Sequence, residues 1–432
     1  MRSYNPIPFG DSPSVGTLER AVDSALRSRI NATRVVCVLL MMYVHVPSGV
    51  SGVNAPELLG GTRLDHWLEL LIVEGPGRAS SALLSIVSGY LIALTLVKMQ
   101  GQYRDGALLN LYKRRSKSII LPMVIWAVIT CAVYLILGAS QETFISAADS
   151  VLDKLNLIFF LTDTPYGPTM HLGFLRDLFM CVLLSPLLLV VLRLAPSVFI
   201  AFLAVAYLAL HSIDVYIILR PLVILGFTIG MSLAISGAPM SALDRYWPLF
   251  ISLMVGFACL IIFTHAGLFS SLESSLAVLN ISLLESILYP LSRLFGSLGI
   301  WCMLPMLLSS RASRWVDAFT PYIFAAFCSH VLVLSILFHG LWSPLLGGPE
   351  SYFHIVWFVS GPFVAMAAAM IIVKLAGSAH PQLATVLTGG RVKGKTSPSK
   401  VTQPAEIVAA HTAQSTPAQK VKREKDQPEG IT

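Results

Sequence analysis

Long apolar runs recur along most of this chain, and the charged residues fall mainly between them. The ten runs cover residues 33–50, 79–98, 118–138, 172–192, 197–213, 216–236, 247–266, 293–309, 319–341 and 353–376. A helix needs about 20 mostly apolar residues to cross the hydrocarbon core of a bilayer. Only 12% of the 432 residues are charged, whereas soluble domains carry about 25%. The sequence therefore predicts an all-α membrane protein, a bundle of about ten transmembrane helices.

The charges between these runs indicate how the chain crosses the membrane. The loop between the second and third runs is the most basic, and it contains Lys98, Arg104, Lys113, Arg114, Arg115 and Lys117. Basic loops stay in the cytoplasm. With ten spans, this orientation places both termini in the cytoplasm of a bacterial-type inner (plasma) membrane. The net charge of +7 then follows from topology, so the expected partners are membrane lipids and not nucleic acid.

Three regions are expected along the chain. Residues 1–30 are polar, show no cleavable signal peptide, and form a cytoplasmic N-terminal segment. Residues 31–378 form the membrane domain. Residues 379–432 are rich in Lys, Thr, Gln, Pro and Ser and are expected to be a disordered basic cytoplasmic tail. Two segments, 151–161 and 276–292, look too short or too polar to span the bilayer and are expected at its outer face.

The first run carries two ionisable residues, which are costly in lipid and therefore candidates for function. Arg34 and His45 are eleven residues apart, which is about three helical turns and about 16 Å along the axis. Both side chains therefore share one face. A cation at the cytoplasmic surface suits a phosphorylated ligand, and an imidazole suits general-base catalysis. The alternative is an interfacial anchor and a histidine that hydrogen-bonds within the bundle.

Other polar residues in or beside the runs have both a functional and a structural interpretation. Ser88 and Tyr90 flank Gly89 in the second run, where small residues also favour close helix packing. The basic pair Arg114 and Lys117 is either a topology signal or a phosphate site. The cysteines lie inside apolar runs and are interpreted as packing residues.

Two further runs carry candidates. Arg176 and Asp177 open the fourth run, and as sequence neighbours they are not expected to face each other on a helix. Each is expected to find another partner, with Arg220 and Glu285 as candidates. His330 lies about three turns into the ninth run and is either catalytic or a packing hydrogen bond. Together with His45 and His171 it forms no recognisable metal-ligand pattern, so no metal is expected.

These positions together resemble acyltransferase family 3, the membrane O-acyltransferases that modify cell-surface carbohydrates. The resemblance runs from about residue 31 to 374. The segments that carry it are 34–45, 84–92, 113–122, 171–178 and 322–330. The chain departs from the family at Asn31, where Asp is usual, and at Lys117, where a second Arg is usual. Gly173 replaces an aromatic residue, and the pattern looks more like the exopolysaccharide-modifying branch.

The resemblance implies transfer of an acetyl or succinyl group to a saccharide acceptor, free or lipid-linked. The donor would be acetyl-CoA or succinyl-CoA, as a substrate and not as a permanently bound cofactor. The implied roles are catalytic for His45 and His330, donor binding for Arg34, Arg114 and Lys117, and substrate binding for Ser88, Tyr90, Arg176 and Asp177. His45 would act as a general base or be transiently acylated.

A succinyl donor would need an extra cation near the thioester, for which Arg176 and Arg220 are candidates. Two other classes compete with the enzyme: a transporter or flippase for a lipid-linked saccharide, and a non-catalytic scaffold of a polysaccharide assembly complex. A transporter would be expected to show repeat symmetry, and the sequence shows no such repeat. This observation favours the acyltransferase.

Overall fold

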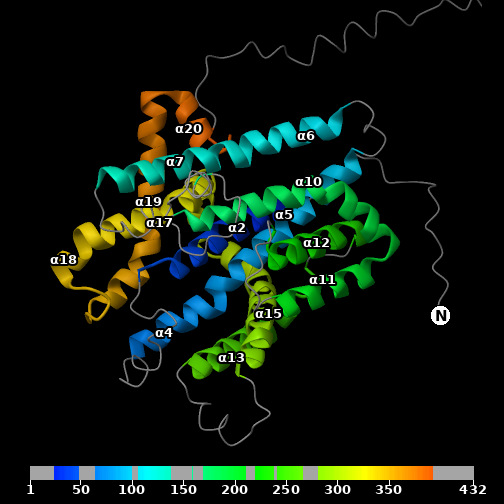
Figure 1. Ribbon diagram of the computed structural model, residues 1–432, viewed down its shortest axis with the longest axis horizontal. Coiled ribbons are helices and arrows are strands. Elements are labelled where there is room, and N and C mark those ends of the chain that lie inside the picture. Colours follow the sequence, from blue (N-terminus) through cyan, green and yellow to red (C-terminus); the bar gives the residue numbers. More distant parts are fainter. Residues whose placement is uncertain are drawn as a thin grey trace, which may run out of the picture. The chain divides into compact units, whose positions relative to one another are not determined.

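All regular elements in the described part of the chain are helices (Figure 1), as predicted. The computed structural model describes residues 24–47, 64–99, 106–137, 158, 169–210, 219–237, 241–265 and 281–392. The α-helices are α2 (Ser24–Val44), α4 (Leu64–Ile72), α5 (Arg78–Lys98), α6 (Ala107–Arg115), α7 (Leu121–Ile136), α10 (Gly173–Leu194), α11 (Pro196–Leu210), α12 (Pro221–Ser236), α13 (Trp247–His265), α15 (Ile281–Leu308), α16 (Ser313–Phe319), α17 (Ile323–Leu337), α18 (Ser343–Leu346), α19 (His354–Ala379) and α20 (Pro381–Leu387).

Short turns of other helix types join or precede some of these helices. The π-helical turns are η1 (Val73–Gly77), η3 (Ser116–Ile120) and η6 (Phe338–Trp342), and the 3-10 turns are η4 (Met170–Leu172) and η5 (Asp244–Tyr246). The π-helical turn η1 runs directly from α4 into α5, and η3 runs from α6 into α7. The second and third predicted spans are therefore parts of longer continuous helices.

Seven helical stretches of the described chain are long and apolar enough to cross a membrane. They are Leu64–Lys98, Ala107–Ile136, Met170–Leu194, Asp244–His265, Leu284–Leu308, Ile323–Leu346 and His354–Ala379. Helices α11 and α12 are apolar but shorter, and α2 carries three arginines over its 21 residues. Each predicted run thus contains a helix. The count of ten crossings and the cytoplasmic placement of both termini stay predictions.

Some predicted boundaries are wrong. The helical stretch that contains the second predicted run begins at Leu64 and not at 79. Two acidic residues in its first part have partners inside the protein: Glu69 contacts His354 and Glu74 pairs with Arg78 at 2.8 Å. The segment 276–292 is not a separate segment at the outer face. From residue 281 onward it forms the start of α15. Segment 151–161 lies outside the described residues except for residue 158.

The C-terminal boundary also moves. After α19, the chain turns and forms α20, which packs against α7 and α19 and buries Ala384 and Leu387. The tail predicted for 379–432 therefore begins later than predicted, because a polar composition hid a short helix with two core residues. The structure describes the chain through residue 392, and the rest of the predicted tail lies outside the described residues.

Helices α5 and α12 pack closely against each other and lie side by side in Figure 1. A Cβ atom at Gly89 would overlap the backbone of Phe227, and a Cβ atom at Gly230 would overlap the backbone of Ile86. Each glycine thus lets the other helix approach. For Gly89, the packing interpretation of the second run is confirmed.

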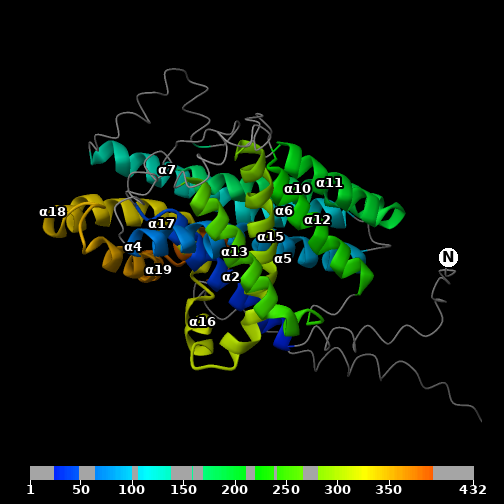
Figure 2. The same ribbon diagram turned by 90° about the horizontal axis from the view of Figure 1, so that it is seen from below.

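Helix α2 lies among α5, α15, α16, α17 and α19. In Figure 2 it lies near α16 and α17, with α10, α11 and α12 grouped on one side. Because α2 contacts α5 and α17, its residues face those of helices that are distant in the sequence. This packing positions the candidate site described next.

Candidate functional site

Three histidines meet where α2 ends. His45 lies in the turn after α2, His171 in η4, and His330 in α17. The centroid of the His45 ring is 5.2 Å from that of His330 and 6.1 Å from that of His171, and the His171 and His330 rings are 4.8 Å apart. The structure therefore brings the two predicted catalytic histidines together and adds a third. We call these three residues the histidine cluster.

Hydrogen bonds fix the orientation of two of these rings. His171 Nε2 lies 3.0 Å from the carbonyl oxygen of Cys328, and His330 Nδ1 lies 2.7 Å from that of Phe327. A carbonyl only accepts, so each of these nitrogens carries a proton. In the neutral rings, His171 Nδ1 and His330 Nε2 are then acceptors, and neither meets a donor among the described residues. Two buried lone pairs are thus available to receive or orient a proton.

The segment that carries His45 is held from the side by α19. His354 Nε2 lies 2.8 Å from the Pro47 carbonyl oxygen, and His354 Nδ1 lies 2.8 Å from Glu69 Oε1. His354 and Glu69 are both buried. This bridge ties the chain two residues after His45 to α4 and α19. It could not be predicted from the sequence, because no local pattern relates residues so far apart.

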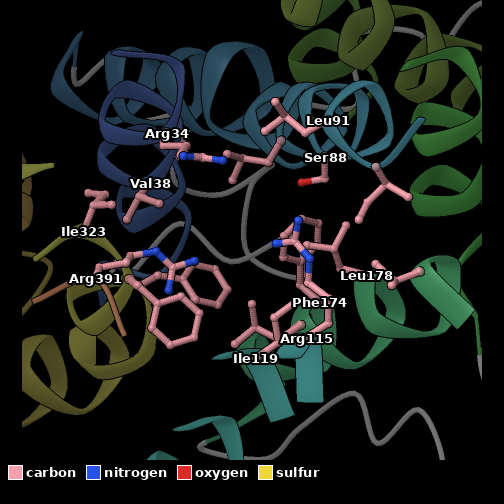
Figure 3. Close-up of a pocket in the computed structure, with 16 residues that line it drawn as sticks. Arg34, Val38, Ser88, Leu91, Arg115, Ile119, Phe174, Leu178, Ile323 and Arg391 are labelled. Atoms are coloured by element: carbon pink, nitrogen blue, oxygen red, sulfur yellow. The ribbon is translucent and has the colours of Figure 1, made fainter. Parts of the chain in front are cut away.

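A pocket next to α2 gathers three arginines. Arg34, Arg115 and Arg391 point into it from three sides in Figure 3. Its other lining residues are Ser88 and the apolar residues Val38, Leu84, Leu91, Ile92, Ile119, Phe174, Leu175, Leu178, Val182, Ile323, Phe324 and Phe327. Among the lining residues that the structure describes, there is no carboxylate. Several cations above an apolar wall suit a ligand with phosphate groups at one end and an apolar chain at the other.

Arg34 lines the pocket and His45 belongs to the histidine cluster, and the structure corrects the basic cluster. Arg114 and Lys117 are exposed and do not line the pocket, whereas Arg115 does. The reason is helical periodicity. Arg115 lies four residues after buried Leu111 and four before buried Ile119, and this stripe faces inward. The spacing was visible in the sequence and could have identified Arg115.

Aromatic residues connect the pocket with the histidine cluster. Phe174 and Phe327 both line the pocket, and their ring centroids are 6.0 Å apart. On its other side, the Phe327 ring lies 5.9 Å from His171 and 5.9 Å from His330. Phe174 and Phe327 thus form an aromatic wall of the arginine-lined pocket, and the histidine cluster lies against Phe327 of this wall.

The predicted substrate-binding residues do not all lie at the pocket. Ser88 lines the pocket, whereas Tyr90 is half-buried elsewhere on α5. Arg176 and Asp177 are buried and lie outside the pocket lining.

The expectation that Arg176 and Asp177 do not face each other is wrong. The Arg176 side chain is long enough to fold back, and its Nε and one Nη lie 2.8 and 2.6 Å from Asp177 Oδ1. Arg220, a predicted companion, lies 3.7 Å from Asp177 Oδ2. The other predicted companion, Glu285, lies 3.6 Å from His265 instead.

Comparison with known proteins shows to which family the chain belongs. Residues 27–374 match the acyltransferase domain of acyltransferase family 3. This match covers most of the chain, so the protein belongs to that family and is a multi-pass membrane acyltransferase, as the sequence motifs predicted.

One curated protein is similar to this chain over most of its length. The chain is 26% identical to the succinoglycan biosynthesis protein ExoH of Rhizobium meliloti (strain 1021) over 379 residues, which are 87% of this chain and 95% of that protein. No solved structure matches the chain.

Proposed function

We propose that this protein transfers a succinyl or acetyl group from acyl-CoA to a sugar hydroxyl of an exopolysaccharide or another cell-surface glycan. The observation that carries the proposal is the position of the histidine cluster against the aromatic wall of an arginine-lined pocket. The family supplies the reaction class. The name of the relative, a succinoglycan biosynthesis protein, supports a saccharide acceptor.

The donor fits the pocket by its chemistry. Acyl-CoA has phosphate groups at one end and a thioester at the end of a long, weakly polar arm. The guanidinium groups of Arg34 and Arg115 would bind the phosphates by paired charge-assisted hydrogen bonds. The arm would follow the apolar lining toward Phe174 and Phe327. The thioester would then reach the histidine cluster.

The transfer step needs a base for the sugar hydroxyl. In direct transfer, His45 takes the hydroxyl proton while the sugar oxygen attacks the thioester carbon. The carbon–sulfur bond breaks, and the CoA thiolate receives the proton from the imidazolium, which gives an ester and CoA thiol. In the covalent alternative, a ring nitrogen of His45 attacks the thioester carbon first, the carbon–sulfur bond breaks, and CoA leaves as the thiol with the proton of the imidazole. The sugar oxygen then attacks the acyl-imidazole, the carbon–nitrogen bond breaks, and the imidazole takes the hydroxyl proton. His330 would accept or relay a proton through its unpaired Nε2.

The charges around the cluster favour a donor with a carboxylate. Arg78 and Arg220 lie close enough to His45 for their charges to act on its ring. Each has an acidic partner, Glu74 at 2.8 Å and Asp177 at 3.7 Å. The Arg220 side chain is partly exposed, so its guanidinium is the candidate partner for the free carboxylate of a succinyl group. An acetyl group would make no use of it.

Mass spectrometry of the surface polysaccharide tests the proposal. We expect a strain lacking this protein to lose one ester from the repeat unit, and the wild-type gene to restore it. The lost mass would name the acyl group. Normal export of polysaccharide with all its esters present in the deletion strain would contradict the proposal for this glycan.

The pocket geometry also makes a prediction about neighbouring arginines. Arg115→Ala should raise the KM for acyl-CoA about 10- to 100-fold, because a hydrogen bond to a charged group is worth about 1.5–3 kcal/mol. Arg114→Ala is the matched control, since this residue is exposed and outside the pocket. Initial rates in membrane vesicles at varied acyl-CoA would measure both. Equal KM values for the two variants would exclude Arg115 from the donor site.

A further inference from the structure

The third arginine of the pocket comes from a part of the chain that the family match does not reach. The match ends at residue 374, and Arg391 follows α20. Arg391 nevertheless lines the same pocket as Arg34 and Arg115. What holds this segment in place therefore decides whether it belongs to the site.

Helix α20 is fixed to the membrane bundle by a buried contact. Trp126 of α7 donates a hydrogen bond from Nε1 to the Leu387 carbonyl oxygen at 3.1 Å. Both residues are buried. At Gly389 the backbone has φ +60°, which L side chains rarely adopt. A Cβ atom there would also overlap the carbonyl oxygen of Ser118 in η3, so glycine lets this turn lie directly on the basic segment.

The turn after α20 then sets the position of Arg391. The backbone N–H of Val392 donates to Thr388 Oγ1 at 3.1 Å, and Thr385 Oγ1 donates to the Val392 carbonyl oxygen at 3.1 Å. The guanidinium of Arg391 lies 4.2 Å above the Phe324 ring and donates to the Thr388 carbonyl oxygen at 2.9 Å. Among the described residues it has no other acceptor. Since a guanidinium has five N–H donors, most of these donors remain available to a ligand.

The charge of Arg391 persists in this environment. Burial and the nearby charges of Arg34 and Arg115 lower the pKa of Arg391 to about 10, so the group stays protonated at neutral pH. Three guanidinium groups without a lining carboxylate repel one another. An anion with several negative charges would relieve this repulsion, and phosphate groups match the fork of arginine.

We infer that the C-terminal segment 381–392 forms a wall of the donor pocket and that Arg391 is a phosphate-binding residue for acyl-CoA. This inference rests on the proposed function and adds a residue from outside the family match. A phospholipid headgroup offers the same phosphate chemistry, so the experiment must separate the two sources.

Coenzyme A binding to the full-length protein in nanodiscs would test the inference, measured by isothermal titration calorimetry. We expect Arg391→Ala to weaken binding about 10- to 100-fold, as for loss of a hydrogen bond to a charged group. Arg391→Lys should lie in between, because lysine keeps the charge but loses the fork. Arg314→Ala, at an exposed site on α16, is the control and should bind as the wild type. Arg391→Gln, which can still donate to the Thr388 carbonyl, replaces the alanine variant if that variant does not fold.

Three results would overturn the inference. If Arg391→Ala and Arg391→Gln bind coenzyme A as the wild type does while Arg34→Ala does not, the C-terminal segment is not part of the donor site and the proposed function stands. The second result concerns heat stability in nanodiscs of phosphatidylglycerol compared with nanodiscs of phosphatidylcholine. If both variants lose only the stabilisation by phosphatidylglycerol, the ligand is a lipid headgroup. If the wild type itself does not bind coenzyme A, the proposed donor is wrong.

Discussion

His45→Ala is expected to lower acyl transfer by about 10²- to 10⁴-fold, the usual contribution of a general base. His45 lies in the turn that follows α2, the helix that carries Arg34, and the Pro47 carbonyl two residues later is held by His354. A missing imidazole removes the proposed proton acceptor of the sugar hydroxyl, and the hydrogen bonds that fix the His171 and His330 rings keep either ring from moving into its position. The measurement is the initial rate of acceptor-dependent CoA release in proteoliposomes that contain equal amounts of protein.

The control variant is His339→Ala. His339 is exposed in η6, next to the end of α17, and it lies outside the cluster and the pocket. Its rate should equal that of the wild type. Coenzyme A should still bind to His45→Ala, because the arginines line the pocket and His45 does not. A His45→Ala enzyme with an undiminished rate would remove His45 from the reaction.

The two chemical routes through His45 predict different products in the absence of acceptor. Covalent catalysis gives protein that carries one acyl group after rapid acid quenching, and hydroxylamine removes it. Direct transfer gives unmodified protein. Intact-mass analysis of the wild type and of His45→Ala distinguishes these routes, since only the wild type can carry an acyl group on this residue.

The sequence could predict those parts of the fold and site that depend on local periodicity. The helical repeat predicted that Arg34 and His45 share a face, and the structure places Arg34 in the pocket and His45 in the histidine cluster after α2. The spacing of Leu111, Arg115 and Ile119 likewise predicts that they share one helix face. The charge density of the loop instead favoured Arg114 and Lys117 as the predicted phosphate site. Hydropathy also located each predicted run on a helix.

Features that depend on tertiary contact could not be predicted in the same way. In the helical stretch that begins at Leu64, Glu69 and Glu74 find partners on α19 and α5. Arg391 enters the pocket because a turn through Gly389 lies on Ser118, a residue 271 positions earlier in the chain. Neither contact leaves a local pattern. Residues of this kind are found only when the packing of the helices is known.

Gly89→Ala and Gly230→Ala are expected to cause the largest losses of stability. At each position, the added Cβ atom would overlap backbone atoms of the facing helix, which cannot rotate away as a side chain can. Overpacking usually costs about 1–3 kcal/mol, and we expect at least the upper end of this range here. Helices α5 and α12 would have to separate, and this movement would also displace Ser88 in the pocket. The fraction of monodisperse protein that survives heating in detergent measures the loss.

Gly256→Ala is the matched control in α13, because a Cβ atom there meets nothing within 4 Å. Alanine is favoured over glycine inside a helix by about 1 kcal/mol, so this variant should be as stable as the wild type or more stable. If all three variants melted alike, glycine would act at the crossing only through helix propensity, and the close approach of α5 and α12 would not matter. A selective loss at Gly89 and Gly230 would instead show that this crossing holds the pocket wall in place, which connects a packing requirement to the binding of the donor.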